Sequence, residues 1–141
     1  MNLRFQAGDM EDGSYTIEVD VPNRLLLLEL VGFWSADTAL AFGRDVHAAT
    51  RRIGVRPHQH LTLADLSRFS LQPQVVVGIC RALIVDARLP SRRLAVVAGE
   101  GLARIQIKRV LVRDRMEVFS DRSSAMNWLL TDETAAVRRM A

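Results

Sequence analysis

The residues with the most chemical potential lie between His58 and Ser70. Asp65 and Ser67 end an apolar segment, where parallel α/β sheets place their binding sites. Asp65 is a candidate base, and a histidine such as His58 or His60 would have to complete the relay. The spacing of the sequence brings no histidine to Asp65. Neither Ser67 nor Ser70 lies in a G-x-S-x-G nucleophile motif. We therefore predict no catalytic residues and expect Asp65 and Ser67 to satisfy backbone donors in a turn.

Metal ligands are also too few. His58 and His60 would project to the same face of a strand. A zinc site needs three or four ligands, and neither His47 nor Cys80 has a matching spacing. We predict no metal site.

A glycine pair at Gly99 and Gly101 raises the question of a nucleotide cofactor, because helix N-termini bind anions. The third glycine of a dinucleotide fingerprint is replaced by Arg104. Glu100 would also repel a phosphate. A tight turn explains the pair, and we predict no cofactor.

Size and composition describe an ordinary globular protein. The 141 residues suit one domain, and 49% are hydrophobic while 25% are charged. The only cysteine, Cys80, fits a reducing compartment. The N-terminus has no apolar signal-peptide core, and no apolar run approaches the ~20 residues that span a bilayer. We expect a cytoplasmic protein, with peripheral membrane contact as an option.

The basic residues do not form a nucleic-acid surface. The formal net charge is +3, and Lys108 is the only lysine among 19 basic residues. Arg104 and Lys108 fall on one helical face, while Arg109 and Arg113 fall on another. One coherent stripe with stacking aromatics would indicate nucleic acid, so we do not expect that partner. Anionic lipid headgroups beside an apolar helix are a better match.

Periodicity and turn residues predict nine elements in the order ββαβαβαβα. Helix–strand alternation after a first antiparallel hairpin implies parallel strands, giving an α/β domain with a mixed five-stranded sheet. Residues 1–14 are predicted to be a mobile start, 15–130 the domain and 131–141 an extension. The predicted strands are 15–21, 24–31, 60–66, 92–97 and 115–119, and the predicted helices are 35–53, 74–88, 101–114 and 120–130.

The helix after Pro73 is apolar around most of its circumference, up to about Leu89. An ordinary surface helix has an apolar stripe somewhat over ~100° wide, and this one covers about twice that. Its second side must therefore pack on a neighbouring helix or meet a partner subunit, an apolar ligand or a membrane surface. We predict a ligand or partner surface that comprises Val75, Val76, Ile79, Cys80, Leu83, Ile84, Arg81, Arg88, Arg104 and Lys108.

Several segments in fixed order resemble the SpoIIAA-like family of the STAS superfamily, which is related in shape to Sec14 or CRAL-TRIO lipid-binding domains. They are V-G-F-W-S-A-D, A-D-L-S, R-R-L-A-V-V and M-E-V-F-S-D-R-S-S-A-M-N-W-L-L, within residues 15–130. The last is the most telling, with Phe119, Ala125, Trp128 and Leu129 in the expected places. The resemblance implies helices mostly on one side of the sheet and a non-enzymatic module.

The same resemblance separates two functions. Anti-sigma-factor antagonists carry a phosphorylated serine at the start of the helix after the third strand. Here that place reads Gln72-Pro73-Gln74-Val75, so Ser67 and Ser70 are the only candidate phosphosites nearby. The SpoIIAA-like branch instead implies membrane association or an apolar ligand. We therefore favour a binding module that uses residues 73–89, with a homodimer as one option, over an antagonist acting through protein–protein contacts.

Overall fold

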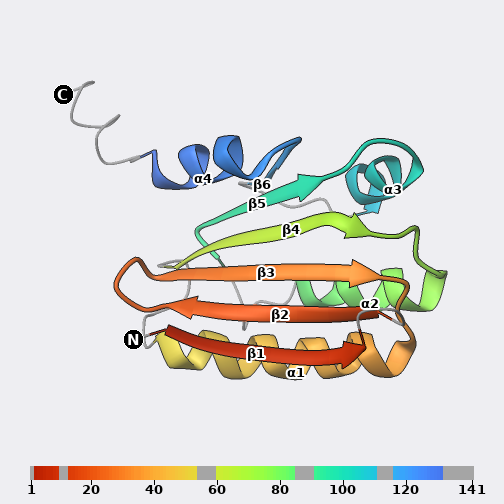
Figure 1. Cartoon of the computed structure of the whole chain (residues 1–141), viewed down its shortest axis with the longest axis horizontal. Helices are drawn as coiled ribbons and strands as arrows, with labels where there is room; N and C mark the ends of the chain where they lie inside the picture. Colours follow the sequence, from red (N-terminus) through yellow and green to blue (C-terminus); the bar gives the residue numbers. More distant parts are fainter. Residues whose placement is uncertain (1, 10–12, 54–59, 85–90, 111–115, 132–141) are drawn as a thin grey trace.

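Six strands form one mixed sheet with helices on both faces (Figure 1). The computed structural model describes residues 2–9, 13–53, 60–84, 91–110 and 116–131. The strands lie side by side in sequence order; β1–β2 and β2–β3 are antiparallel, and the later pairs are parallel. The elements are β1 Asn2–Asp9, β2 Gly13–Asp20, β3 Leu25–Gly32, α1 Ala36–Ile53, β4 Leu61–Phe69, α2 Gln74–Ile84, β5 Arg93–Ala98, α3 Leu102–Val110, β6 Met116–Phe119 and α4 Arg122–Leu130.

The predicted α/β class, element order and hairpin are confirmed from β2 onward. Helix α1 shows why its sequence signals worked. The Ser35 hydroxyl accepts a hydrogen bond from the Thr38 backbone N–H at 3.2 Å, which caps the helix. The buried residues of α1 are the five that helical spacing predicted: Ala39, Phe42, Val46, Ala49 and Ile53.

Within residues 1–14, which we predict to be a mobile start, the structure has a strand, and the sheet has six strands where the sequence predicts five. Residues 2–9 form β1, which pairs along its full length with β2. Strand β2 is therefore an interior strand and not the sheet edge. The sequence carried a signal, because Leu3, Phe5 and Ala7 alternate with polar residues.

Helices α1, α2 and α3 cover one face of the sheet, and α4 covers the other. Residues 64, 66, 94 and 96 join the core under the first three helices, whereas their strand neighbours 63, 95 and 97 pack with Ala125 and Leu129 of α4. This alternation is the period of two of β-strands. In Figure 1, α1 and α2 lie behind the sheet. The implied arrangement of helices mostly on one side is confirmed.

Three local expectations need correction. Strand β4 continues to Phe69, so Asp65 and Ser67 lie within a strand. The sequence predicts Ser120 as the N-cap of the last helix, but Asp121 caps α4, since its carboxylate accepts from the Ser124 N–H at 2.8 Å. These hydrogen bonds lower the pKa of Asp121. The apolar pattern of residues 120–130 predicts that Leu130 is buried, but its side chain is 55% exposed.

Candidate functional site

An apolar cavity of about 100 Å³ lies between α1, α2 and the sheet. The alternation of β3, β4 and β5 brings one set of side chains to its floor, and helical spacing supplies its two walls. Leu28, Ala64 and Val96 are among the floor residues, while Phe42 and Val46 come from α1 and Cys80, Leu83 and Ile84 from α2. The surroundings are almost entirely hydrocarbon, so the cavity is suited to an apolar guest.

One end of this cavity is polar. His60, Thr62 and Ser91 line it and are 2%, 6% and 3% exposed. The Thr62 and Ser91 hydroxyls are hydrogen-bonded to each other. Both lie at the amino-terminal end of the parallel strands, where β4 and β5 begin. The cavity therefore has a hydroxyl-lined end and an apolar body.

Helix α2 places the predicted surface residues in three environments. Val76 is fully buried, whereas Ile79, Cys80, Leu83 and Ile84 are half-buried and pack on the core below α1 and α2. Val75 is 58% exposed, and Arg81 is also exposed. Burial raises the pKa of the Cys80 thiol to about 11. Cys80 is therefore protonated at neutral pH and is a poor nucleophile.

The wide apolar surface of α2 is partly covered by other helices of the same chain. Helix α1 contacts one side of it, and α3 meets its N-terminal half. Gln72 and Gln106 exchange two hydrogen bonds of 3.0 Å between backbone and side chain, and Ile107 of α3 lies near Val76 and Val77. Packing against other helices of the same chain therefore covers much of the apolar surface of α2. The cavity lies beneath the remaining part of that surface.

Of the predicted basic residues, Arg81 is exposed on α2, whereas Arg104 and Lys108 lie on α3. Arg104 donates to the Ala98 carbonyl at 3.1 Å and to the Ser120 hydroxyl at 3.3 Å. It thus ties α3 to the ends of β5 and β6. Lys108 is exposed on α3, and Arg88 lies outside the described residues.

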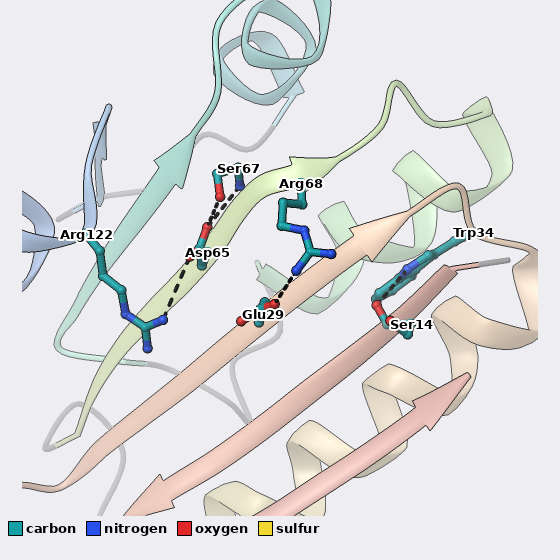
Figure 2. Close-up of polar contacts among 7 residues, drawn as sticks. All are labelled: Ser14, Glu29, Trp34, Asp65, Ser67, Arg68 and Arg122. Carbon is teal, nitrogen blue, oxygen red and sulfur yellow. Dashed lines mark hydrogen bonds and ion pairs between the residues drawn. The ribbon is translucent and has the colours of Figure 1, made fainter. Parts of the chain in front are cut away.

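Asp65 lies in a polar cluster on the opposite face of the sheet (Figure 2). Its carboxylate accepts from the Ser67 backbone N–H at 3.0 Å and from the Ser67 hydroxyl at 2.6 Å. Arg122 approaches it at 3.9 Å. The expected turn chemistry is thus confirmed, although it occurs in a strand. His60 lines the cavity on the other face, so it cannot serve Asp65 as a relay; His58 lies outside the described residues.

The two candidate phosphosites differ in setting. The Ser67 hydroxyl is engaged by Asp65, and a phosphate there would meet the carboxylate charge. Ser70 is exposed, and its backbone N–H donates to the Gly32 carbonyl at 3.1 Å. Phosphorylation of either residue stays a prediction.

Exposed apolar side chains are concentrated at the carboxyl ends of the parallel strands. Phe33 follows β3, and Leu71 lies between β4 and α2. Val75 lies in the first turn of α2, and Leu102 and Ile105 lie in the first turns of α3. Their exposed fractions range from 47% to 69%. We call these five residues the apolar rim. Of these five, only Val75 belongs to the predicted surface, because loop ends and short helices carry little periodic signal.

Over the described ranges, no three His, Cys, Asp or Glu residues are grouped to hold a metal ion. In those same ranges no helix has both the length and the hydropathy to cross a bilayer.

Solved structures share this fold. One is an uncharacterised protein of the DUF3478 family with a SpoIIAA-like fold from Shewanella loihica PV-4; the match has a TM-score of 0.63 and 15% identity and covers 87% of this chain and 98% of the other. Another is an anti-sigma factor antagonist from Mycobacterium paratuberculosis, with a TM-score of 0.56, 13% identity and coverage of 92% and 94%. No protein-family model and no curated protein matches the sequence. The chain therefore has the SpoIIAA-like fold that the sequence resemblance implied.

Proposed function

We propose that this SpoIIAA-like fold serves as a non-enzymatic binding module, holding a small apolar ligand between the sheet and helices α1 and α2. The cavity of about 100 Å³ is the observation that carries this proposal. Protein interiors are close-packed and have few voids larger than a water molecule. A ligand that filled this space would bury the apolar side chains that line it, which is favourable.

The chemistry of the surrounding groups supports binding over catalysis. The Cys80 thiol that lines the cavity is neutral, because burial raises its pKa to about 11. Asp65 and His60 belong to opposite faces of the sheet. Apolar walls with a few placed polar groups are typical of small-molecule sites.

A direct test fills the cavity with a larger side chain on strand β4. Ala64→Leu adds an isopropyl group at a residue that lines the cavity, so we expect n-pentane binding to weaken at least tenfold. Cavity filling should also leave stability unchanged or raise it by about 1 kcal/mol. Binding can be measured by nuclear magnetic resonance titration and by protection of Cys80 from iodoacetamide. Native mass spectrometry would show any ligand that co-purifies.

The matched control is Ala82→Leu, the same change at an exposed residue of α2. It should bind pentane like the unmodified chain. Equal binding by Ala64→Leu, or no binding by the unmodified chain at saturating pentane, would contradict the proposal.

The apolar rim favours a second candidate, a regulator that binds a protein partner. Five exposed apolar side chains near the carboxyl ends of the parallel strands are typical of an interaction surface. One solved structure with this fold is an anti-sigma factor antagonist. A purified anti-sigma factor is therefore the partner to test, with Ser67 and Ser70 as the candidate phosphosites.

We expect the double variant Phe33→Ser/Leu102→Ser to weaken that complex at least tenfold in a calorimetric titration. Leu130→Ser is the matched control, because Leu130 is 55% exposed on α4, away from the rim. Kinase treatment followed by mass spectrometry would identify a modified serine. Flotation with anionic vesicles or self-association in sedimentation, both lost in the double variant, would instead assign the rim to a membrane or a homodimer.

A further inference from the structure

Arg92, the residue before β5, carries a buried donor without an acceptor. Its Nε is buried and has no hydrogen-bond partner within the described ranges, although the side chain as a whole is only half-buried. The ion pairs found in those ranges join Arg68 to Glu29 and Arg122 to Asp65, and neither includes Arg92. A guanidinium stays charged in proteins and can only donate. Burial of such a donor costs free energy unless an acceptor meets it.

Arg24 lies two strands from Arg92, at the same end of the sheet. The Arg24 carbonyl accepts from the Leu61 N–H, and the His60 carbonyl accepts from the Arg92 N–H, both at 2.8 Å. Only β4 therefore separates the two arginines, and the spacing of strands puts their backbones roughly 10 Å apart. Arg24 is exposed in the turn before β3. Two arginine side chains can converge on one anion across such a gap.

The surrounding charge at this end of the molecule is also positive. Arg51 and Arg52 are exposed in the last turn of α1, and Figure 1 shows that α1 ends beside the amino ends of the parallel strands. An acid at this end, Asp20 of β2, already accepts from the backbone and side chain of Asn23 at 3.3 and 2.8 Å. The amino ends of the strands are therefore basic, whereas the apolar rim lies at the carboxyl ends.

We propose that Arg92 and Arg24 bind a phosphate group at the amino ends of the parallel strands. The planar fork of N–H donors on an arginine matches the paired oxygens of a phosphate or a carboxylate. A phosphate monoester carries a charge of about −1.5 to −2 at neutral pH and has three acceptor oxygens. It therefore suits a site with two guanidinium groups better than a carboxylate does. Neither arginine lines the apolar cavity, so this site is separate from the proposed ligand-binding site.

The test titrates the full chain with inorganic phosphate and follows the arginine Nε–H signals by nuclear magnetic resonance. We expect the Arg92 signal to shift, because its Nε–H gains an acceptor. Arg92→Lys keeps the charge but removes the fork, so it should weaken phosphate binding at least about fivefold. Arg24→Asn should weaken it roughly twofold to fivefold by removing the second cation. Asparagine tolerates the φ of 53° at residue 24, so this variant decides the question if the first does not fold.

Arg109→Lys is the matched control, because Arg109 is exposed on α3, which Figure 1 places at the carboxyl end of β5. It should change phosphate binding less than about twofold. Equal losses in Arg92→Lys and Arg109→Lys, or an Arg92 signal that phosphate does not shift at constant ionic strength, would overturn the proposal. Pentane binding should be the same in Arg92→Lys, so failure of the phosphate site would leave the proposed function standing.

Flotation with phosphatidylcholine vesicles that contain phosphatidic acid distinguishes the source of the phosphate group. Flotation that Arg92→Lys reduces would support a lipid headgroup at this site. Binding of inorganic phosphate without flotation would support a soluble phosphorylated ligand. A chain that neither binds phosphate nor floats would overturn both forms of the proposal.

Discussion

At the scale of single residues, Gln72 connects the carboxyl ends of the strands. It is 6% exposed, and its side-chain oxygen accepts from the Trp34 backbone N–H at 2.9 Å. Its side-chain amide donates to the carbonyls of Gly32 and Ser70 at 2.8 and 2.9 Å. Resemblance placed the missing phosphoserine of antagonists at Gln72-Pro73-Gln74-Val75. In this chain the first residue of that segment holds two strand ends together.

We expect Gln72→Leu to lower the free energy of unfolding by about 2–4 kcal/mol, because buried groups at Trp34 and Gly32 lose their partners. Chemical denaturation measures this loss. Gln74→Leu is the control, since Gln74 is exposed in the first turn of α2 and should change stability by less than about 0.5 kcal/mol. Equal stabilities for the two variants would show that the Gln72 hydrogen bonds add little.

At the scale of elements, α4 explains the most telling sequence segment. Arg93 of β5 donates to the backbone carbonyls of Trp128 and Thr131 at the end of α4. Its guanidinium lies 4.6 Å from the centre of the Trp128 ring, which is favourable electrostatically. Phe119 packs on the same ring with centroids 5.7 Å apart. The V-F-S-D…A-x-x-W-L pattern therefore encodes the docking of α4 on its face of the sheet.

The fold could be predicted wherever periodicity and caps agreed. Helix α1 is an example, since Ser35 and five spaced apolar residues specify it locally. Strand β1 could not be placed in the same way, because Gly8 and Asp9 weaken an alternation that only pairing with β2 stabilises. The end of β4 was missed for a similar reason. Asp65 and Ser67 have strong turn preferences, and the pairing of β4 with β3 and β5 overrides them.

The candidate site was only half predictable. The wide apolar surface of α2 predicted that Cys80, Leu83 and Ile84 pack against something other than the sheet. All three line the cavity. Thr62 and Ser91 were not identified, because a polar residue in a strand indicates a site only once its face is known. Their contact joins residues 29 positions apart, and helical or strand periodicity carries no information on such pairs.

At the scale of the whole molecule, β1 protects an otherwise open edge. Tyr15, Ile17 and Val19 of β2 are at most 1% exposed, and the backbone of β2 pairs with β1 at eight positions. Tyr15 also donates to the Asp45 carboxylate of α1 at 2.6 Å. Without β1, a strand that is rich in β-branched and aromatic residues would become the sheet edge. Such edges recruit other chains.

Deleting residues 1–9 should therefore both destabilise the chain and make it associate. Each cross-strand pair contributes about 0.2–1 kcal/mol, so we expect an unfolding free energy lower by roughly 2–5 kcal/mol and a mass that rises with concentration in light scattering. Thr16→Lys in the truncated chain is the decisive control, because a charge on the new edge should restore the monomer without restoring stability. Association that persists with Lys at residue 16 would mean that the exposed surface, and not edge pairing, drives it. A truncated chain that stays monomeric and equally stable would show that β1 contributes nothing to the closure of the sheet.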